Sequence, residues 1–207
     1  MFCDADDMFL SAGGLYIILE EIKKGEFDCL IPVFSEECKD NNGNSIFINH
    51  NNDATFVHGK VYRRQYLIDK NIRWNLILTV HEDSYFNYLC RVCTTPDRIR
   101  ECKQVYYLWK HRPDSICRTD KKWVLKTYDK MILSTSCLLD ELIKRGLLNR
   151  AKEISCNFTY DSYFTLNKDE WCSEENKEFR EQFFKVFAIF YTKFWPVAEL
   201  LTEQERN

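Results

Sequence analysis

Long hydrophobic runs are missing from this sequence of 207 residues. The longest, such as the AIFY run that begins at Ala188, fall far short of the roughly 20 apolar residues that cross a bilayer. The N-terminus also lacks a basic stretch followed by an apolar core, so we expect no signal peptide. The sequence contains no internal repeat and no low-complexity segment. These absences predict a chain without a transmembrane segment.

An excess of positive charge is also missing. The formal net charge is -3 and the isoelectric point is about 5.9. Proteins that coat nucleic acid usually have a basic surface, so we expect no nucleic-acid partner. Any binding of phosphate must therefore depend on a local group of basic residues.

The ten cysteines do not form a recognisable zinc-binding pattern. Only Cys90 and Cys93 have the Cys-x-x-Cys spacing, and no second pair follows at the spacing of a zinc ribbon. We expect reduced, buried thiols and a cytoplasmic location. The length, with 45% hydrophobic and 29% charged residues, fits a globular chain with one substantial core.

The first half of the sequence alternates between helical and extended patterns. Apolar residues at helical spacing, followed by Gly25, predict a helix over 11–25. Residues 27–37 predict a strand, which the turn at 41–44 joins to a second strand in a hairpin. We also expect a strand end at residues 1–3, a short strand at 56–57 and a short helix over 64–70.

The second half changes from mixed to helical. A helix is expected over 84–92, stopped by Pro96, and a strand over 103–109. From Lys122 onward the pattern is helical, with a break at Gly146. We expect a final helix from Ser173 until Pro196 interrupts it, with five aromatic residues on one side: Phe183, Phe187, Phe190, Tyr191 and Phe194.

Three carboxylates stand close to the N-terminus, in the sequence DADD. Asp4 and Asp6 are two residues apart, and Asp7 follows directly. Carboxylates at this spacing can converge on one hard cation, and Mn²⁺ or Mg²⁺ bound in this way usually also binds substrate phosphates. The alternative is a solvated acidic loop that caps a helix.

A second acidic pair, Glu82 and Asp83, begins a helical pattern. The helix dipole stabilises a carboxylate in the first turn as an anion, which keeps it available as a base or ligand at neutral pH. The alternative is simple capping of the helix. His81 is either a partner of this pair or a residue at the end of a strand.

Two basic groups accompany the acidic ones. The first contains Lys60, Arg63 and Arg64, and the second contains Lys110, His111 and Arg112. Arginine binds phosphate in bidentate geometry, and Gly59 allows the backbone to approach a ligand closely. In the alternative interpretation the arginines pair with acids and His111 is structural.

The order and spacing of these groups resemble the glycosyltransferase family 2 type of GT-A sugar-nucleotide transferase. The resemblance depends on four segments in order: DADD, HGKVYRRQYL, HEDSYF and YYLWKHRPDSI. They are similar to the DxD metal motif, the G-K-x-Y-R-R-x-x-L segment, the E-D motif with the catalytic base, and a tyrosine-rich strand followed by basic residues. The similarity extends over roughly residues 1–118.

The resemblance implies a role for each group. Asp6, with Asp4 nearby, would hold Mn²⁺ or Mg²⁺ on the diphosphate of a nucleotide-sugar donor. Asp83 would be the general base for a glycan or other hydroxyl acceptor, and the anomeric centre would invert. Glu82 would orient the acceptor or Asp83. The remaining candidates for donor or acceptor contacts are Asp7, His58, Lys60, Arg63, Arg64, His81, His111 and Arg112.

The resemblance also implies an α/β fold. Residues 1–120 would be the C-terminal part of a GT-A-like mixed sheet flanked by helices, and 121–207 a helical C-terminal extension packed on it. The family's nucleotide-binding half, which precedes the DxD motif, is missing from this sequence, so we expect a chain truncated at its N-terminus or a partner chain that supplies that half. The alternatives are an inactive transferase remnant, a partner-binding module or, less favoured, a metal-dependent phosphoesterase.

Overall fold

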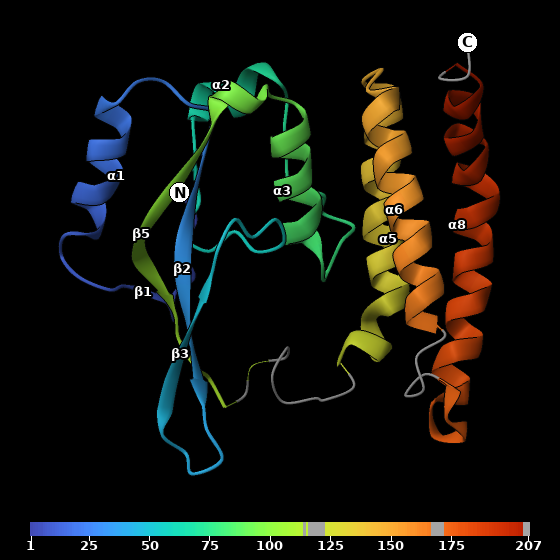
Figure 1. The fold of residues 1–207 in the computed structure, drawn as a ribbon, viewed down its shortest axis with the longest axis horizontal. Coiled ribbons are helices and arrows are strands. Elements are labelled where there is room, and N and C mark those ends of the chain that lie inside the picture. Colours follow the sequence, from blue (N-terminus) through green and yellow to red (C-terminus); the bar gives the residue numbers. More distant parts are fainter. Residues whose placement is uncertain (114, 116–122, 167–171, 205–207) are drawn as a thin grey trace. The chain divides into compact units, whose positions relative to one another are not determined.

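The computed structural model describes residues 1–113, 115, 123–166 and 172–204 (Figure 1). The chain divides into two compact units. The first comprises Met1–Asn75 and Phe86–Thr119, and the second comprises Leu76–Tyr85 and Asp120–Asn207. We describe each unit by itself.

A mixed sheet forms the centre of the first unit. Its strand order is β1-β5-β2-β3, and β4 also pairs with β2. β2 and β5 run parallel, whereas the other pairs are antiparallel. Within the described residues the strands are β1 (Met8–Phe9), β2 (Cys29–Lys39), β3 (Ser45–His50), β4 (Val61–Tyr62) and β5 (Ile99–Trp109).

The hairpin of β2 and β3 confirms the turn predicted at 41–44. Asp40 closes this turn, because its Oδ1 accepts hydrogen bonds from the backbone N–H groups of Asn42 and Asn44, both at 2.8 Å. Gly43 has a φ of 83°, a conformation that glycine adopts without steric cost. The local sequence therefore determines where β2 ends and β3 begins.

β5 is the strand that organises the core of this unit. It begins at Ile99, four residues before the expected start, because its first residues pair with β2 from Cys29 onward. Tyr106 and Tyr107 are fully buried in a cluster with Leu30 and Phe34. This aromatic core also packs against Phe56, in the loop between β3 and β4.

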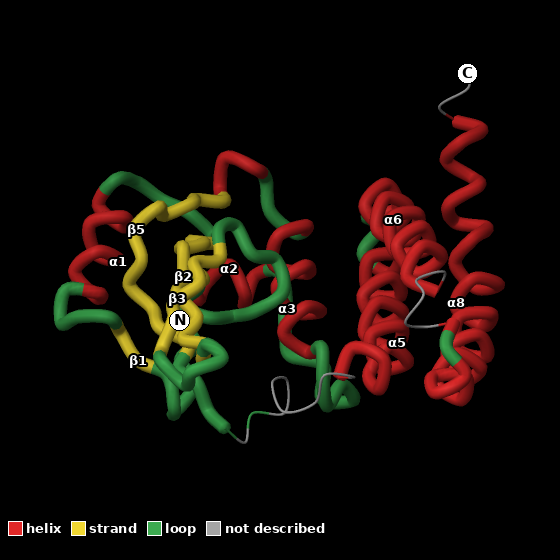
Figure 2. Tube along the Cα trace, turned by 60° about the horizontal axis from the view of Figure 1, so that its bottom comes forward, coloured by secondary structure: helices red, strands yellow, loops and turns green. Residues whose placement is uncertain are grey.

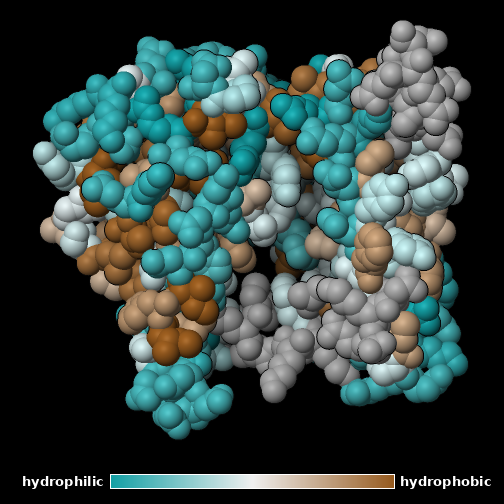
Figure 3. Space-filling view, viewed as in Figure 1, coloured by the Kyte–Doolittle hydropathy of each residue, from teal (hydrophilic) through white to brown (hydrophobic). Residues whose placement is uncertain are grey.

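The three helices predicted in the first half are present as α1 (Gly14–Lys23), α2 (Arg64–Asp69) and α3 (Glu82–Val92). The 3-10 helix η1 (Pro96–Arg98) was not predicted. α1 turns Ile18 into the core. Leu15, Leu19 and Ile22, at the same helical spacing, lie about half exposed. Figure 3 shows apolar surface, in brown, on this unit beside the polar surface in teal.

Two short predicted strands are wrong. Residues 56–57 are loop, because Asp53 and Gly59 fold this segment into turns and the chain becomes extended only at β4. Residues 1–3 are not a strand either. Instead, the ring of Phe2 packs against Trp74 and Phe86, with centroids 5.3 and 5.5 Å apart.

Most of the described part of the second unit is helical (Figure 2). It contains α5 (Trp123–Lys144), α6 (Leu148–Leu166), the 3-10 helix η2 (Glu174–Asn176) and α8 (Lys177–Gln204). Gly146, with a φ of 72°, separates α5 from α6 as predicted. The expected start at Lys122 lies just outside the described residues.

Pro196 does not interrupt the last helix, so that prediction is wrong. α8 continues through it to Gln204. A proline inside a helix costs about 3 kcal/mol, and buried aromatic residues before it offset this cost. Phe183, Phe190 and Phe194 are all buried in the helical unit, where tertiary packing outweighs the local preference.

No helix among the described residues is long and apolar enough to cross a membrane. α8 is the longest of them, and its sequence is interrupted by charged side chains. The nine cysteines within the described residues are free thiols.

Candidate functional site

A tight turn brings two of the three N-terminal carboxylates together. The backbone N–H of Asp7 donates to the carbonyl of Asp4 at 3.1 Å. Because of this turn, Asp4 and Asp7, which are three residues apart, lie on the same side of the chain. Asp4 and Asp6, which are two residues apart, do not. Asp4 remains exposed, whereas the side chain of Asp7 is 1% exposed.

A loop between β3 and β4 supplies the third residue of the site, His58. Asp53 holds the loop closed, because its Oδ1 accepts the backbone N–H groups of Thr55 at 2.8 Å and Phe56 at 2.7 Å. The ammonium of Lys60 lies 3.6 Å from the same oxygen and donates to the carbonyl of Phe56. Lys60 is thus buried inside the loop, where it stabilises the loop's shape.

Gly59 allows this loop to pack tightly on β5. Its φ is 67°, and a Cβ at this position would lie 2.8 Å from the Cβ of Tyr107. The hydroxyl of Tyr106 donates to the Gly59 carbonyl at 2.9 Å. A larger residue would push the loop, and His58 with it, away from the strand.

Asp4, Asp7 and His58 converge to form the candidate functional site. One ligand atom from each lies within 4.8 Å of the others. His58 Nδ1 is 3.6 Å from Asp7 Oδ2. The imidazole is buried among aromatic rings and stacks on Trp109 and Phe56 at centroid distances of 4.8 and 5.1 Å.

The chemistry of these donors fits a divalent cation. Atoms bound to one cation at about 2.0–2.3 Å lie about 3–4.5 Å from one another, so the present spacing needs little adjustment. Two carboxylates with one imidazole suit Mn²⁺ better than Mg²⁺, which prefers oxygen ligands. Burial raises the pKa of Asp7 above its usual value, although hydrogen bonds from Tyr107 and the Lys110 N–H act in the opposite direction. A cation at this site would favour the ionised carboxylate.

Asp6, which we expected to hold the metal, points to a different partner. Its Oδ2 accepts a hydrogen bond from Arg112 Nη1 at 2.7 Å. This contact lowers the pKa of the Asp6 carboxyl. Both side chains are well exposed, and Asp6 lies outside the group of three converging ligands.

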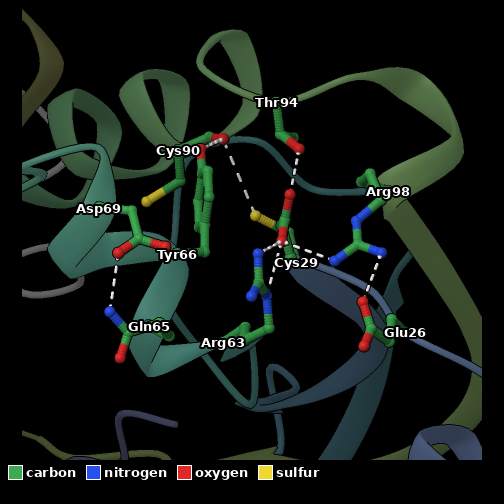
Figure 4. Close-up of polar contacts among 10 residues, drawn as sticks. Glu26, Cys29, Arg63, Gln65, Tyr66, Asp69, Cys90, Thr94 and Arg98 are labelled. Atoms are coloured by element: carbon green, nitrogen blue, oxygen red, sulfur yellow. Dashed lines mark hydrogen bonds and ion pairs between the residues drawn. The ribbon is translucent and has the colours of Figure 1, made fainter.

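Arg63 forms part of a structural ion-pair network around the buried Asp28 (Figure 4). Its Nη2 lies 2.7 Å from Asp28 Oδ1, and Arg98 Nη2 lies 3.2 Å from the same oxygen. Thr94 donates to the other oxygen at 2.5 Å. Burial alone would raise the pKa of Asp28, but the hydrogen bonds from Thr94, Arg98 and Arg63 lower it overall. This arrangement agrees with the alternative interpretation, in which Arg63 pairs with an acid.

Two other predicted basic residues lie at the surface of the first unit. Arg64 is exposed at the first position of α2. His111 follows β5, and its backbone N–H donates to Glu37 Oε2 at 3.3 Å.

Glu82 and Asp83 belong to the second unit and occupy the first turn of α3. His81 precedes them with a φ of 59°, and its carbonyl accepts a hydrogen bond from Ser134 at 2.8 Å. Its Nε2 lies 3.3 Å from Thr127 Oγ1. Burial lowers the pKa of His81, which favours the neutral imidazole at neutral pH. The resemblance also implies that Asp4, Asp6 and Asp83 line a single cleft, and this stays a prediction.

Sequence reasoning missed the residues that hold the site in place. Tyr107 and Asp53 contact the candidate ligands or their loop, and neither belonged to the candidate set. One signal was present: Tyr107 and Trp109 are two residues apart in a strand, so their side chains point to the same face. Both rings stack on His58.

Comparison of the fold identifies its class. The mixed sheet with flanking helices is a GT-A-like glycosyltransferase fold. The chain is similar to residues 1–349 of TarS from S. aureus, a structure solved in complex with UDP, with a TM-score of 0.51 and 15% sequence identity. The match covers 99% of this chain and 66% of that chain. No protein-family model matches the sequence, and no curated protein matches it.

Proposed function

We propose that this chain is the catalytic, acceptor-side portion of an inverting, metal-dependent glycosyltransferase of the family 2 type. It would move a sugar from a nucleotide-sugar donor to the hydroxyl of a glycan or other acceptor. The observation that supports this most is the convergence of Asp4, Asp7 and His58 in a GT-A-like fold.

Asp4, Asp7 and His58 would hold the metal, in place of the pair Asp4 and Asp6. A bound Mn²⁺ would neutralise negative charge on a diphosphate leaving group. The buried Asp7 and His58 fix two ligands, and the exposed Asp4 leaves one side of the site open. Arg112, which pairs with Asp6 in the same acidic stretch, would contact a phosphate of the donor.

Asp83 would be the general base that takes the proton from the acceptor hydroxyl. Its place in the first turn of α3 favours the anion, because the positive end of the helix dipole lies there. Glu82 would orient the acceptor. His81, kept neutral by burial, would support the start of the helix rather than contribute charge.

The nucleotide of the donor would need a binding wall opposite Asp4. The solved neighbour is in complex with UDP, which is consistent with a nucleotide-sugar donor for this chain. Because the chain spans 66% of that neighbour, we propose that a further polypeptide segment supplies the wall. A cytoplasmic location stays a prediction from the composition.

Exposure of Phe183, Phe187 and Phe194 in the last helix would favour the alternative of a partner-binding module. Phe183 and Phe194 are buried within the helical unit, and Phe187 is partly buried. These rings pack as core, so they do not favour that alternative.

Product analysis tests the proposed reaction. The protein is incubated with Mn²⁺, a panel of nucleotide sugars and hydroxyl acceptors, and the sugar is followed by mass spectrometry and NMR. We expect the sugar on the acceptor with an inverted anomeric centre. Release of the sugar phosphate together with the nucleoside monophosphate would instead indicate a phosphoesterase.

Two acid-to-amide variants test the base. Asp83→Asn should lower the rate of transfer by about 10²–10⁴-fold, the usual contribution of a general base. Asp97→Asn is the matched control, because Asp97 lies in η1 and takes part in none of the contacts described above for the candidate residues. Equal rates for the two variants would exclude Asp83 as the base.

A further inference from the structure

One buried tyrosine of β5, Tyr107, touches all three residues of the candidate functional site. Its hydroxyl donates a hydrogen bond to Asp7 Oδ2 at 2.7 Å. The hydroxyl oxygen of Tyr107 also accepts a hydrogen bond from the backbone N–H of Asp4 at 3.3 Å. A single phenol therefore fixes the turn that places the two carboxylates.

The ring of Tyr107 fixes the third residue. It lies nearly parallel to the His58 imidazole, with an interplanar angle of 20° and centroids 5.8 Å apart. The Cβ of Tyr107 occupies the space beside Gly59, so the loop that carries His58 rests directly on this residue. The hydroxyl and the ring thus act on different members of the site.

The hydroxyl of Tyr107 donates to one oxygen of the Asp7 carboxylate and leaves the other oxygen for a different partner. That other oxygen, Oδ1, accepts the Lys110 backbone N–H at 3.1 Å.

We propose that Tyr107 is a positioning residue that holds Asp4, Asp7 and His58 in the arrangement that binds the metal. This inference rests on the proposed function, because it presumes that the three residues are the ligands. Tyr107 would act through them and would not contact substrate. It would orient Asp7 through the hydroxyl and His58 through the ring.

A single-atom substitution separates the hydroxyl from the ring. Tyr107→Phe keeps the ring against His58 and removes the hydrogen bonds to Asp7 and Asp4. Tyr66→Phe is the matched control, because Tyr66 is also buried in the first unit and loses a hydroxyl that donates to the Cys90 carbonyl at 2.6 Å (Figure 4). Both variants lose one buried hydrogen-bonded hydroxyl, so a general effect on stability is shared.

Binding of Mn²⁺, measured by electron paramagnetic resonance on the full chain, is the first readout. Tyr107→Phe should weaken binding about 10–100-fold, the usual effect of removing a residue that orients a metal ligand. Tyr66→Phe should bind as the unsubstituted protein does. Equal affinity in Tyr107→Phe and the unsubstituted protein, or equal losses in both variants, would overturn the inference.

Hydrogen exchange is a second readout that needs no metal. The amide of Asp4 donates to the Tyr107 hydroxyl, so its exchange should accelerate in Tyr107→Phe and not in Tyr66→Phe. If the unsubstituted protein binds no Mn²⁺, the metal part of the proposed function fails, and the exchange data still decide whether Tyr107 positions the turn. If it binds Mn²⁺ and both readouts are unchanged in Tyr107→Phe, the proposed function stands and the role of Tyr107 is wrong.

Discussion

Two ends of one short segment, His58 and Arg63, have different surroundings in this protein. His58 is buried next to two carboxylates, and one ligand atom from each of the three residues lies within 4.8 Å of the others. Arg63, five residues later, pairs with the buried Asp28, which also binds Arg98 and Thr94. Both residues belong to the stretch HGKVYRR, in which every charged residue first looked like a candidate for binding. The difference teaches that the partners of a side chain, rather than its type, separate a binding site from a structural cross-link.

The largest effect should come from removing the centre of the cross-link. Asp28→Ala leaves Arg63 and Arg98 without their shared partner, and breaking a buried ion pair of this kind costs about 3–5 kcal/mol. The free energy of unfolding, measured with urea, should fall by an amount near the lower end of this range, because the arginines are partly exposed. Asp97→Ala, at an exposed position, is the control.

Asp28→Ala also tests whether the cross-link around Asp28 is separate from the candidate site. The Mn²⁺ affinity of the molecules that remain folded should be unchanged in Asp28→Ala. A large loss of Mn²⁺ affinity without loss of stability would show that the cross-link belongs to the site.

Lowering the pH should weaken the cross-link around Asp28. The folded-state pKa of Asp28 is lowered, so its contribution to stability is present above the ordinary aspartate pKa of about 4 and is lost as the pH falls through the folded value. The free energy of unfolding of the unsubstituted protein should therefore fall more steeply below about pH 4 than that of Asp28→Asn. Parallel pH profiles of urea unfolding would contradict this prediction.

Gly59→Ala should have an intermediate effect at the other end of the segment. The added Cβ would meet Tyr107 at 2.8 Å, in a backbone conformation that alanine disfavours. Overpacking of this kind costs about 1–3 kcal/mol, and the displaced loop should also weaken Mn²⁺ binding. Gly43→Ala is the control: it has a similarly positive φ but no atom within 4 Å of the new Cβ. Equal Mn²⁺ affinity in the two variants would contradict the tight packing at Gly59.

The smallest effect is expected from Arg112→Ala. Its ion pair with Asp6 is exposed on both sides, and such pairs contribute less than about 1 kcal/mol. The thermal midpoint should barely change. A loss as large as that of Asp28→Ala would show that Asp6 and Arg112 also form a structural cross-link.

Much of the first unit could be predicted from local sequence. Turn residues such as Asp40 and Gly43 determine the hairpin through their own backbone contacts, and helical spacing predicts α1, α2 and α3. The short strand at 56–57 could not be predicted correctly. Its backbone is shaped by Asp53 and by the close approach of Gly59 to β5, a strand some fifty residues away in the sequence.

The candidate site was predicted in part. The acidic stretch and the histidine segment were recognised, but the pairing of Asp4 with Asp7 was not, because the turn at residues 4–7 replaces the expected strand end. Local sequence also does not reveal the ion pairs of Lys60 with Asp53 and of Arg63 with Asp28.

The sequence by itself determined the mixed α/β character, the helical second half and the types of residue available for binding a cation. These features depend on composition and on short-range periodicity, which the printed sequence contains in full. The tertiary structure alone decided which acids converge and which basic residues remain accessible. That decision depends on β5, since Tyr107 joins the N-terminal turn to the His58 loop across about a hundred residues of chain, and no local pattern reports a contact of such separation.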